Sequence, residues 1–331
     1  MTDHLYELII IGGGPAGLAA GIYAARDSLD CLLFEKDASG GQLVLATEVA
    51  NYPGFPAPLT GYELVERMRE HARRFGLAVR VETVVALGVG ENAISITTDK
   101  RQYRARTVIV ASGSSYRMLG VPGEERLRGR GVSYCGSCDG PLFRGGSLVV
   151  VGGGDTALEE ALFLTRFAAK IRIVHRRNEL RAKRYLQKIA FAHEKIEFIL
   201  DSVVREIRGQ ERVGGVLIEN VREKSRHELA CDGVFIFIGT QPNSGFLRGC
   251  CACDEAGYVV TDANMCTSAP GIFAAGDVRK DSVRQIASAV GDGVTALIRA
   301  GQFLSAHGCG GSAIAQLQNE NIRLAREKDM L

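Results

Sequence analysis

The same glycine-rich pattern occurs twice in this chain, and the two copies align without a gap. Apolar residues 8–11 lead into G-x-G-x-x-G at residues 12–17, and apolar residues 148–151 lead into G-x-G-x-x-A at residues 152–157. A single pattern of this kind is weak support for a nucleotide site. Two copies in register predict a chain built from two separate nucleotide-binding units.

Each copy continues into a helical stretch and a second apolar run. The helical stretches are expected to reach Arg26 and Arg166, and the second runs end at Glu35 and His175, each 23 positions after the first glycine of its copy. Strand, glycine-rich turn, helix and strand in that order form the dinucleotide-binding context. The predicted fold class is therefore α/β, with two nucleotide-binding Rossmann-like three-layer domains.

The first copy has an acidic residue at the end of its second strand. Gly12 permits the tight turn, Gly14 lets the backbone approach a pyrophosphate, and Gly17 lets the helix pack on the strand. The pyrophosphate would bind the free amides at the start of the helix. Glu35 would accept hydrogen bonds from two ribose hydroxyls, which predicts FAD or NAD at this site.

The second copy has basic residues at the same place. A carboxylate there would repel a 2′-phosphate, whereas guanidinium groups bind one through charge-assisted hydrogen bonds. We therefore predict NADPH at the second site, bound by His175, Arg176, Arg177 and Arg181. The alternative is that these residues belong to a solvated basic face.

The order of the strands indicates that the second domain is inserted into the first. A strand-like run at residues 107–111 leads into Ser112-Gly113, and one at residues 233–238 leads into Gly239. A third run at residues 271–275 leads into Gly276-Asp277 and returns the chain to the first domain. The expected parts are a discontinuous FAD-binding domain (1–113 and 246–308), an NADPH-binding domain that carries a cysteine pair (114–245) and a C-terminal extension (309–331).

Charge and hydropathy exclude several other classes of protein. The chain has 40 basic and 38 acidic residues, a net charge of +2 that does not suit a nucleic-acid-binding protein. The uncharged run at residues 8–25 is long enough to span a membrane, but its glycines fit a strand, turn and helix better. Asp3 and Glu7 precede this run and no Lys or Arg does, which does not fit a signal peptide. We expect a cytoplasmic protein.

A Cys-x-x-Cys pair, Cys135 and Cys138, lies between the two glycine-rich patterns. Nine cysteines in a cytoplasmic protein are not expected to form a disulfide framework. Zinc would need a second ligand pair, and Cys250 with Cys253 lies 112 residues away. We favour a reversible redox disulfide without metal. Asp139 is then either the proton donor to a leaving thiolate or a residue of a helix cap or turn.

Three cysteines crowd one short segment, Cys250, Cys251 and Cys253. With Cys231 and Cys266 they could form a metal site or an auxiliary thiol relay. We favour small apolar side chains and surface thiols, because no second ligand pair lies at a short, regular distance.

From about Tyr6 to His307 the sequence closely resembles the low-molecular-weight thioredoxin reductases. The resemblance rests on the following segments, whose order and spacing are similar to those of that family: residues 12–17, 40–43, 48–55, 135–140, 152–157 with 175–177 and Arg181, 276–277 and 284–285. It implies a homodimer with a discontinuous FAD domain and an inserted NADPH domain.

The resemblance also implies which residues bind the cofactors. Around FAD they would be Gly12, Gly14, Pro15, Ala16, Gly17, Glu35, Lys36, Gly41, Gln42, Leu43, Asn51, Ala111, Gly113, Gly276, Asp277, Arg284, Gln285 and Ile286. Around NADPH they would be Gly152, Gly154, Asp155, Thr156, His175, Arg176, Arg177, Arg181, Ile238 and Gly239.

In proteins of that family NADPH reduces FAD, FAD reduces the disulfide, and the dithiol reduces thioredoxin. By this likeness Cys138 would face the flavin, Cys135 would attack the disulfide of thioredoxin, and Asp139 would serve as acid–base. The second domain would rotate about linkers near residues 113–115 and 243–245. This rotation is needed because nicotinamide and Cys138 cannot contact the same face of the flavin simultaneously.

Two features depart from the family pattern. The interior of the cysteine pair is Gly-Ser, where Ala-Thr is commoner, and this difference could alter the redox potential or the choice of partner. The extension has no counterpart in the family; Ile314, Leu317 and Leu324 stand at helical spacing, which suggests a weak amphipathic helix or a disordered end.

Other functions remain open at this point. The acceptor, expected to be a separate chain, could be another thioredoxin-like or glutaredoxin-like protein. A flavin-dependent thiol oxidase or a ferredoxin-fed reductase would not need a 2′-phosphate site, so the basic residues disfavour both. A redox sensor that is not an enzyme would bind the cofactors without multiple turnovers.

Overall fold

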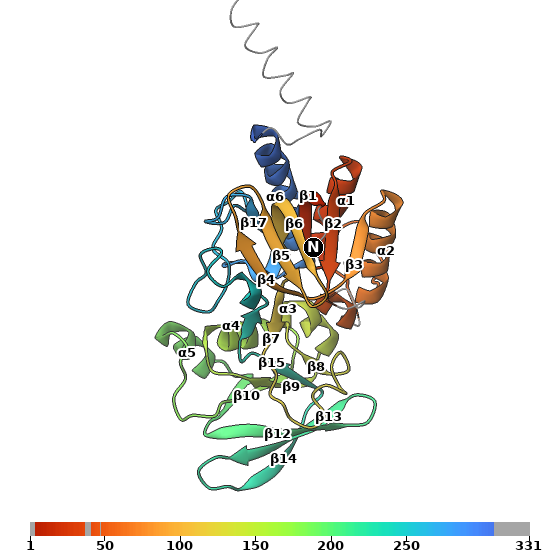
Figure 1. The fold of residues 1–331 in the computed structure, drawn as a ribbon. Coiled ribbons are helices and arrows are strands. Elements are labelled where there is room, and N and C mark those ends of the chain that lie inside the picture. Colours follow the sequence, from red (N-terminus) through yellow and green to blue (C-terminus); the bar gives the residue numbers. More distant parts are fainter. Residues whose placement is uncertain (1–3, 37–40, 47, 308–331) are drawn as a thin grey trace, which may run out of the picture. The chain divides into compact units, whose positions relative to one another are not determined.

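The computed structural model describes residues 4–36, 41–46 and 48–307. The chain forms two compact units (Figure 1). The outer unit comprises Met1–Ser115 and Gln241–Leu331, and the inserted unit comprises Tyr116–Thr240. The extension from residue 309 onward, including Cys309, Ile314, Leu317 and Leu324, lies outside the described residues.

The outer unit is built on a seven-stranded sheet in the order β3-β2-β1-β6-β5-β4, with β17 also paired to β6. Its strands are β1 (Leu5–Ile11), β2 (Cys31–Glu35), β3 (Ala78–Val81), β4 (Val84–Val89), β5 (Ile94–Thr98), β6 (Gln102–Val110) and β17 (Ile272–Ala274). The first half of β6 pairs antiparallel with β5, and its last three residues pair parallel with β17. β1 lies along one edge of β6. The other edge of β6 is therefore shared by β5 and β17.

The side chains of β1 alternate between the two faces of the sheet, and both faces are buried. Leu8 and Ile10 pack in one core cluster with residues of the helices α1 (Pro15–Arg26), α2 (Gly61–Arg74) and α6 (Ile286–Ala306). Ile9 and Ile11 pack in a second cluster with residues of β4 and β5. Successive strand residues face opposite sides, so a continuous apolar run is what a strand covered on both faces requires.

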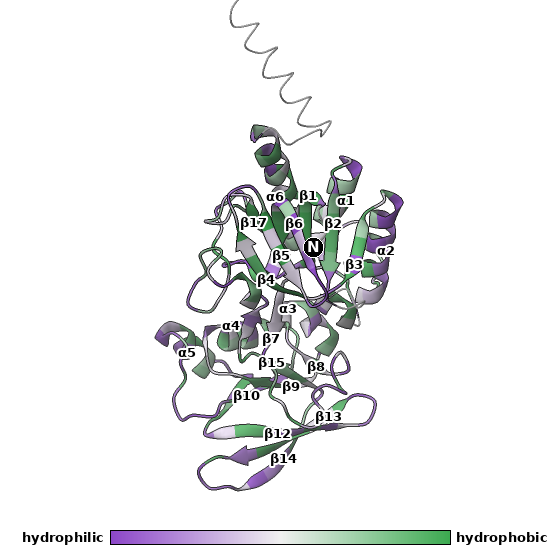
Figure 2. Cartoon of the chain, viewed as in Figure 1, coloured by the Kyte–Doolittle hydropathy of each residue, from purple (hydrophilic) through white to green (hydrophobic). Residues whose placement is uncertain are grey.

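Local signals fix the helices of the outer unit. Proline at the first position of α1 suits a helix start, because its missing N–H would have no helical partner there. At the start of α2 the Thr60 side chain accepts the Glu63 N–H, and the Glu63 carboxylate accepts the Thr60 N–H, a capping box. Figure 2 shows α2 largely hydrophilic and β2 hydrophobic.

The inserted unit repeats this design with a different outer layer. Its parallel sheet has the order β11-β10-β9-β15-β8, and a separate antiparallel sheet has the order β12-β13-β14. The strands are β8 (Val132–Ser133), β9 (Ser147–Val151), β10 (Lys170–Val174), β11 (Ile196–Ile199), β12 (Ser202–Gly209), β13 (Val213–Asn220), β14 (Arg226–Ala230) and β15 (Gly233–Ile236). The helices are α3 (Gly136–Asp139), α4 (Asp155–Leu164) and α5 (Arg184–Phe191).

The parallel sheet of the inserted unit lies between two layers. Leu148 and Val150 of β9 pack with residues of α4 and α5, whereas Val149 and Val151 pack with residues of β12 and β13. The arrangement has three layers: helices, parallel sheet and antiparallel sheet. The predicted α/β fold class is therefore confirmed.

The helix of the second copy is shorter than the sequence indicates. α4 ends at Leu164, with Thr165 as its C-cap, and does not reach Arg166. The Thr165 hydroxyl donates to the Leu162 carbonyl at 2.7 Å, a local bond of the kind that competes with helix propagation. In the first copy α1 ends at Arg26, as expected.

The two segments that connect the units pair with each other. β7 (Ser114–Tyr116) and β16 (Thr240–Pro242) form a two-stranded sheet. Next to it the Asn243 N–H donates to the Gly113 carbonyl at 3.0 Å, and the Asn243 side chain donates to the Ser112 carbonyl at 2.9 Å.

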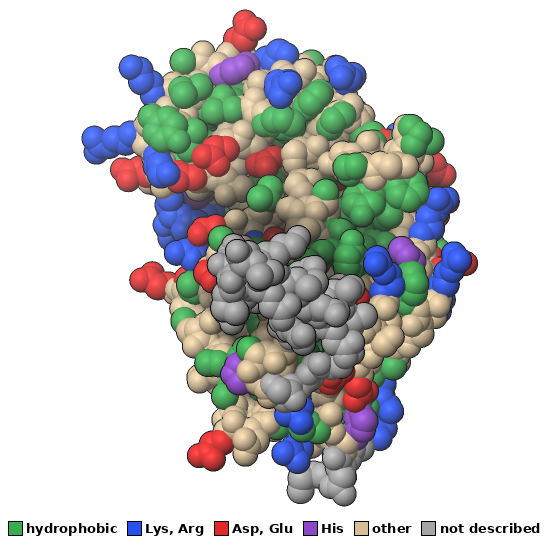
Figure 3. Space-filling view, turned by 90° about the horizontal axis from the view of Figure 1, so that it is seen from above, with side chains coloured by type: hydrophobic (Ala, Val, Ile, Leu, Met, Phe, Trp, Pro, Cys, Tyr) green, Lys and Arg blue, Asp and Glu red, His purple; other side chains and the backbone are tan. Residues whose placement is uncertain are grey.

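The surface carries charges of both signs. On the face in Figure 3, Lys and Arg side chains are interspersed with Asp and Glu side chains. Among the described residues, none of the helices combines the length and apolar character needed to cross a membrane. The run at residues 8–25 forms the end of β1, the glycine-rich turn and most of α1.

Candidate functional site

The three glycines of the first turn have different surroundings. Gly12 has φ of +109°, and a Cβ on it would stand 2.3 Å from the Ala111 carbonyl oxygen. A Cβ on Gly17 would stand 1.8 Å from the Gly12 carbonyl oxygen. Gly14 has no heavy atom within 4 Å of its Cβ position. Gly12 and Gly17 are thus required by packing, while Gly14 leaves open space at the start of α1, where a phosphate can reach the amides.

The second turn has the same division of roles. A Cβ on Gly152 would stand 2.5 Å from the Phe237 carbonyl oxygen and 2.6 Å from the Cβ of Ala157. The Cβ position of Gly154 is again open. Asp155 and Thr156 begin α4 directly after this space. The Asp155 carboxylate accepts the main-chain N–H of Lys183 at 2.7 Å, so it helps to fix the loop above the turn.

The acidic residue of the first copy lies over its glycine-rich turn. Glu35 ends β2, and its Oε2 accepts the Gly13 N–H at 2.5 Å while Oε1 accepts the Lys36 N–H at 2.8 Å. A Cβ on Gly13 would stand 2.6 Å from the same Oε2. The carboxylate is therefore oriented beside the space that Gly14 leaves open.

The basic segment of the second copy also lies over its turn. The His175 ring covers Gly153, whose Cβ position is 2.3 Å from the ring Nδ1. The ring is buried, and its Nε2 has no hydrogen-bond partner among residues 4–36, 41–46 and 48–307. Burial lowers the pKa of His175, and the positive charge of Arg181 lowers it further. A neutral ring with an unsatisfied nitrogen is suited to a ligand in this space.

The guanidinium-bearing residues meet at the same end of the sheet. Arg176 and Arg177 come directly after His175, which follows the end of β10, and both are exposed. The Arg181 main-chain N–H donates to the Gly153 carbonyl at 2.7 Å, which brings the segment around Arg181 onto the turn. Ile238 and Gly239 come after β15, at the same carboxyl-terminal end of the parallel strands.

Several of the expected flavin residues gather around the first turn. A Cβ on Gly41 would be 4.0 Å from the Gly14 Cα, and a Cβ on Gly276 would be 3.1 Å from the Ala16 Cβ. Asp277 follows Gly276, and burial raises the pKa of its carboxyl group. The turn, Gly41 and Gly276 thus border one region, although they come from distant parts of the sequence.

Gln42 and Ser114 connect this region to the segment that leaves the outer unit. The Gln42 side-chain amide donates to the Ser114 carbonyl. Its Oε1 is buried and makes no hydrogen bond in the part of the chain that the structure describes. Leu43 lies in the same 3-10 helix, η1 (Gly41–Leu45), and packs against the core.

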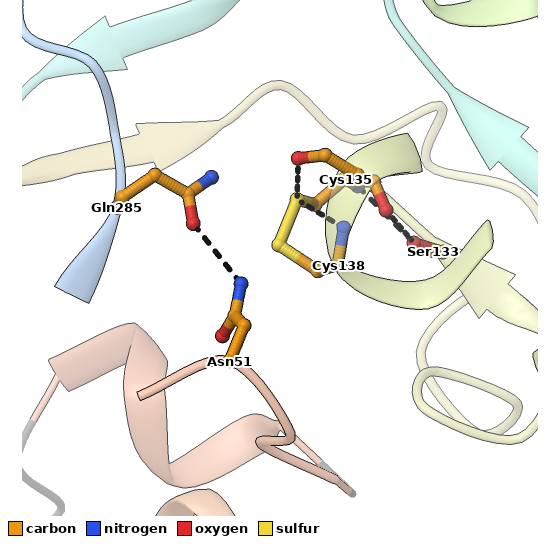
Figure 4. Close-up of a disulfide and its surroundings, with 6 residues drawn as sticks. Asn51, Ser133, Cys135, Cys138 and Gln285 are labelled. Carbon is orange, nitrogen blue, oxygen red and sulfur yellow. Dashed lines mark hydrogen bonds between the residues drawn. A yellow bond between two sulfur atoms is a disulfide. The ribbon is translucent and has the colours of Figure 1, made fainter. Parts of the chain in front are cut away.

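The remaining expected flavin residues lie at the start of α6. The Asn51 side-chain amide donates to Gln285 Oε1 at 3.3 Å (Figure 4). Gln285 is the N-cap of α6, and Ile286 is its first residue. Arg284 has φ of +57° and places its guanidinium group over the Tyr258 ring, 5.6 Å from the centroid.

Asp292 is a site residue that the sequence analysis missed. It lies in α6, and its Oδ2 accepts the Gly276 N–H at 3.0 Å and two guanidinium N–H groups of Arg279 at 3.0 and 2.9 Å. The neighbouring Gly293 packs so closely that its Cβ position is 2.1 Å from the Ala16 carbonyl oxygen. A Gly-Asp-Gly run inside a helix was the available signal, since glycine in a helix interior often marks close packing.

Cys135 and Cys138 form a disulfide in the inserted unit (Figure 4). Cys135 is the N-cap of the short helix α3, and its Sγ accepts the Cys138 N–H at 3.2 Å. The Ser133 hydroxyl accepts the Cys135 N–H at 3.1 Å and donates to the Cys135 carbonyl at 3.2 Å. The Cys138 amide at the Cys135 sulfur favours a thiolate there once the disulfide is reduced. Asp139 is the half-buried last residue of α3.

The other described cysteines are weak acids. Burial raises the pKa of Cys231 and of Cys251 to about 12, and it raises the pKa of Cys250, Cys253 and Cys266 as well. Cys250 donates its S–H to the Leu87 carbonyl at 3.1 Å. Within the described ranges, three or more His, Cys, Asp or Glu residues nowhere gather in a way that could hold a metal ion. Protonated thiols of this kind are poor nucleophiles.

Comparison with known proteins assigns the family. Residues 6–293 match the family "Pyridine nucleotide-disulphide oxidoreductase". A thioredoxin reductase of Peptoclostridium acidaminophilum is 42% identical over 311 residues, 92% of this chain and 99% of the relative. One of Bacillus subtilis (strain 168) is 45% identical over 292 residues, 88% of this chain and 92% of the relative.

A solved structure agrees with both sequence matches. The crystal structure of thioredoxin reductase from Streptococcus pyogenes MGAS5005 superposes with a TM-score of 0.89 at 45% identity, covering 92% of this chain and 100% of that one. This chain therefore belongs to the pyridine nucleotide-disulphide oxidoreductase family and, within it, to the thioredoxin reductases.

Proposed function

We propose that this enzyme transfers electrons from NADPH through FAD to the Cys135–Cys138 disulfide, and from the resulting dithiol to the disulfide of thioredoxin. The observation that carries the proposal is the disulfide itself, held at a helix N-terminus in a unit that also contains one of the two nucleotide turns. The thioredoxin reductases among its relatives support thioredoxin as the acceptor.

The residues present fit both cofactors. Open space at Gly14, the oriented Glu35 carboxylate and the unsatisfied Gln42 Oε1 suit the pyrophosphate, ribose and ring of FAD. Open space at Gly154 and the unsatisfied His175 Nε2 suit NADPH. When bound, FAD supplies a hydride acceptor that can pass two electrons onward.

The family resemblance and the positions of these residues support the following roles. Glu35 would hold the ribose of FAD, and Asp277 with the Asn51–Gln285 pair would hold its ribityl chain and ring. Arg176, Arg177 and Arg181 would bind the 2′-phosphate of NADPH, with His175 and Gly239 beside them. The remaining expected contacts, such as Lys36, Pro15, Ala111, Gly113, Leu43 and Ile238, would shape the same two sites.

The disulfide takes up two electrons and two protons and becomes a dithiol. The Cys135 thiolate attacks one sulfur of the thioredoxin disulfide, and the Cys138 thiol then closes the Cys135–Cys138 bond and releases reduced thioredoxin. Asp139 would deliver and remove the proton at Cys138. We also propose a cytoplasmic homodimer, because a reversible dithiol operates in a reducing compartment and the family resemblance implies two chains.

The test is an anaerobic titration of the purified protein with NADPH and with NADH, monitored by flavin bleaching, followed by the addition of thioredoxin. We expect bleaching by NADPH and multiple turnovers with thioredoxin. Cys138→Ser should remain yellow and be bleached by NADPH, but should not reduce thioredoxin. Electron transfer to oxygen alone would indicate a thiol oxidase, and cofactor binding without turnover would indicate a redox sensor.

A further inference from the structure

The redox turn contacts α4 through two glycines. A Cβ on Gly136 would stand 2.1 Å from Oε2 of Glu160, and a Cβ on Gly140 would stand 2.8 Å from Cδ2 of Leu164. Glu160 and Leu164 are four residues apart on α4 and therefore share one face of that helix. The Glu160 carboxyl group thus lies against the residue that directly follows Cys135.

This carboxyl group is in an unusual environment. Its Oε2 is buried and has no hydrogen-bond partner among the described residues. Burial raises the pKa of Glu160. The Gly136 amide lowers this pKa, and the negative charge of Glu159 raises it. Buried polar atoms without a partner are uncommon in folded proteins because they destabilise the fold. Such an atom beside a reactive pair suggests a role other than stability.

We propose that Glu160 is a positioning residue for the Cys135–Cys138 pair, and that its carboxyl group opposes the formation of a thiolate at Cys135. The inference rests on the proposed function only in taking this pair as the electron carrier. Two opposing influences then act on the Cys135 sulfur. The Cys138 N–H stabilises negative charge on it, and a negative charge on the Glu160 carboxyl group across Gly136 destabilises it.

The consequence concerns the reduction potential of the pair. Reduction of the disulfide takes up two electrons and two protons, and a stabilised thiolate favours the reduced form. Glu160 weakens that stabilisation, so it makes the dithiol a stronger reductant towards an acceptor disulfide. The absence of a side chain at Gly136 is needed for this effect, because a side chain at this position would displace the Glu160 carboxyl group.

The first experiment compares Glu160→Gln with Glu159→Gln in the full-length protein. Both variants remove one negative charge from α4, but Glu159 is exposed. Each protein is equilibrated with defined ratios of reduced and oxidised dithiothreitol, alkylated, and analysed by mass spectrometry of the peptide that contains Cys135 and Cys138. We expect Glu160→Gln to shift the equilibrium three- to tenfold towards the dithiol, where tenfold is about 30 mV for a two-electron couple. Glu159→Gln should shift it less than twofold.

The second experiment uses Gly136→Ala, alone and combined with Glu160→Gln. The clashing atom is the end of a flexible side chain, so the carboxyl group can move away and the chain can still fold. Gly136→Ala should shift the equilibrium in the same direction as Glu160→Gln, and the double variant should show no further shift beyond either single one. The pKa of the reduced Cys135 thiol, from its alkylation rate against pH, should fall in all three.

Two results would overturn the proposal. One is the same potential and thiol pKa in Glu160→Gln as in Glu159→Gln. The other is a shift by Gly136→Ala that persists in full in the Glu160→Gln background. None of these measurements uses NADPH, flavin reduction or thioredoxin, so their outcome is separate from that of the proposed function.

Discussion

The main-chain N–H of Arg181 donates to the carbonyl oxygen of Gly153 at 2.7 Å, and this bond brings a basic segment onto a glycine-rich turn. The bond is made by the backbone, so it does not depend on the arginine side chain. A substitution in this basic region can therefore remove charge without releasing the segment.

The first prediction concerns the choice of nucleotide. Arg176→Ala combined with Arg177→Ala should raise the KM for NADPH about tenfold or more, because each charge-assisted hydrogen bond contributes about 1.5–3 kcal/mol. The KM for NADH should change little. Arg184→Ala is the matched control, since this exposed residue of the same basic region begins α5. An equal effect of Arg184→Ala would favour a general basic face over a 2′-phosphate site.

The second prediction distinguishes the role of Gly14 in binding FAD from the role of Gly17 in packing. Gly14→Ala should give a folded protein that retains less FAD, because its Cβ occupies only the open space at the start of α1. Gly17→Ala should lower the melting temperature and prevent FAD binding, since its Cβ would lie 1.8 Å from the Gly12 carbonyl oxygen. Thermal unfolding and the ratio of flavin to protein measure both effects. Full FAD retention in Gly14→Ala would contradict a phosphate at this turn.

Short-range features of the site could be predicted from the sequence. Glu35 and His175 each lie 23 positions after the first glycine of their turn, and the two cysteines lie three positions apart, so local spacing sets their positions. The three-layer fold class was predicted from the order of strand, glycine-rich turn, helix and strand in each copy. The comparisons confirm the fold class, the family and the enzyme class that these motifs indicated.

Features that depend on packing between distant segments could not be predicted in the same way. Asp292 reaches Gly276 from a helix, and Glu160 reaches Gly136 from another, and neither residue stands in a motif that the sequence analysis used. The antiparallel sheet of β12, β13 and β14 replaces a helical layer, which no local spacing near the second turn indicates. At the early end of α4 the Thr165 hydroxyl donates to the Leu162 carbonyl, a local bond that the apolar pattern does not indicate.

The third prediction concerns Asp292. Asp292→Asn removes the charge that pairs with Arg279 and weakens the bond that orients Gly276 and Asp277. The variant should lose about 1–3 kcal/mol of stability and release FAD faster during dialysis. Asp281→Asn, an exposed change of the same kind near the same segment, should do neither. Unchanged FAD release in Asp292→Asn would show that Asp292 does not position this site.

The fourth prediction concerns acid stability of the inserted unit. Hydrogen bonds from Arg205 and Arg226 lower the pKa of Glu219 to about 2, compared with about 4.3 in an unfolded chain. A lowered pKa means that this group stabilises the folded state above the unfolded-state pKa, and that the contribution is lost as the pH falls from about 4.3 towards 2.

Glu219→Gln should therefore unfold at lower urea concentration than the wild type at pH 7, and the difference should shrink at pH 3. Tyrosine fluorescence and circular dichroism report the unfolding. Glu211→Gln, at an exposed position, is the control for a general charge effect. A difference that stays constant between pH 7 and pH 3 would mean that the ionised Glu219 is not the source.

The position of β17 beside β6 constrains the order in which a nascent chain can fold. β17 and α6 complete the core of the outer unit, but they leave the ribosome only after all of residues 116–240 have been synthesised. The inserted unit is continuous and can become native during translation. The outer unit, whose first strands emerge earliest, must wait with an open sheet edge until the last quarter of the polypeptide arrives.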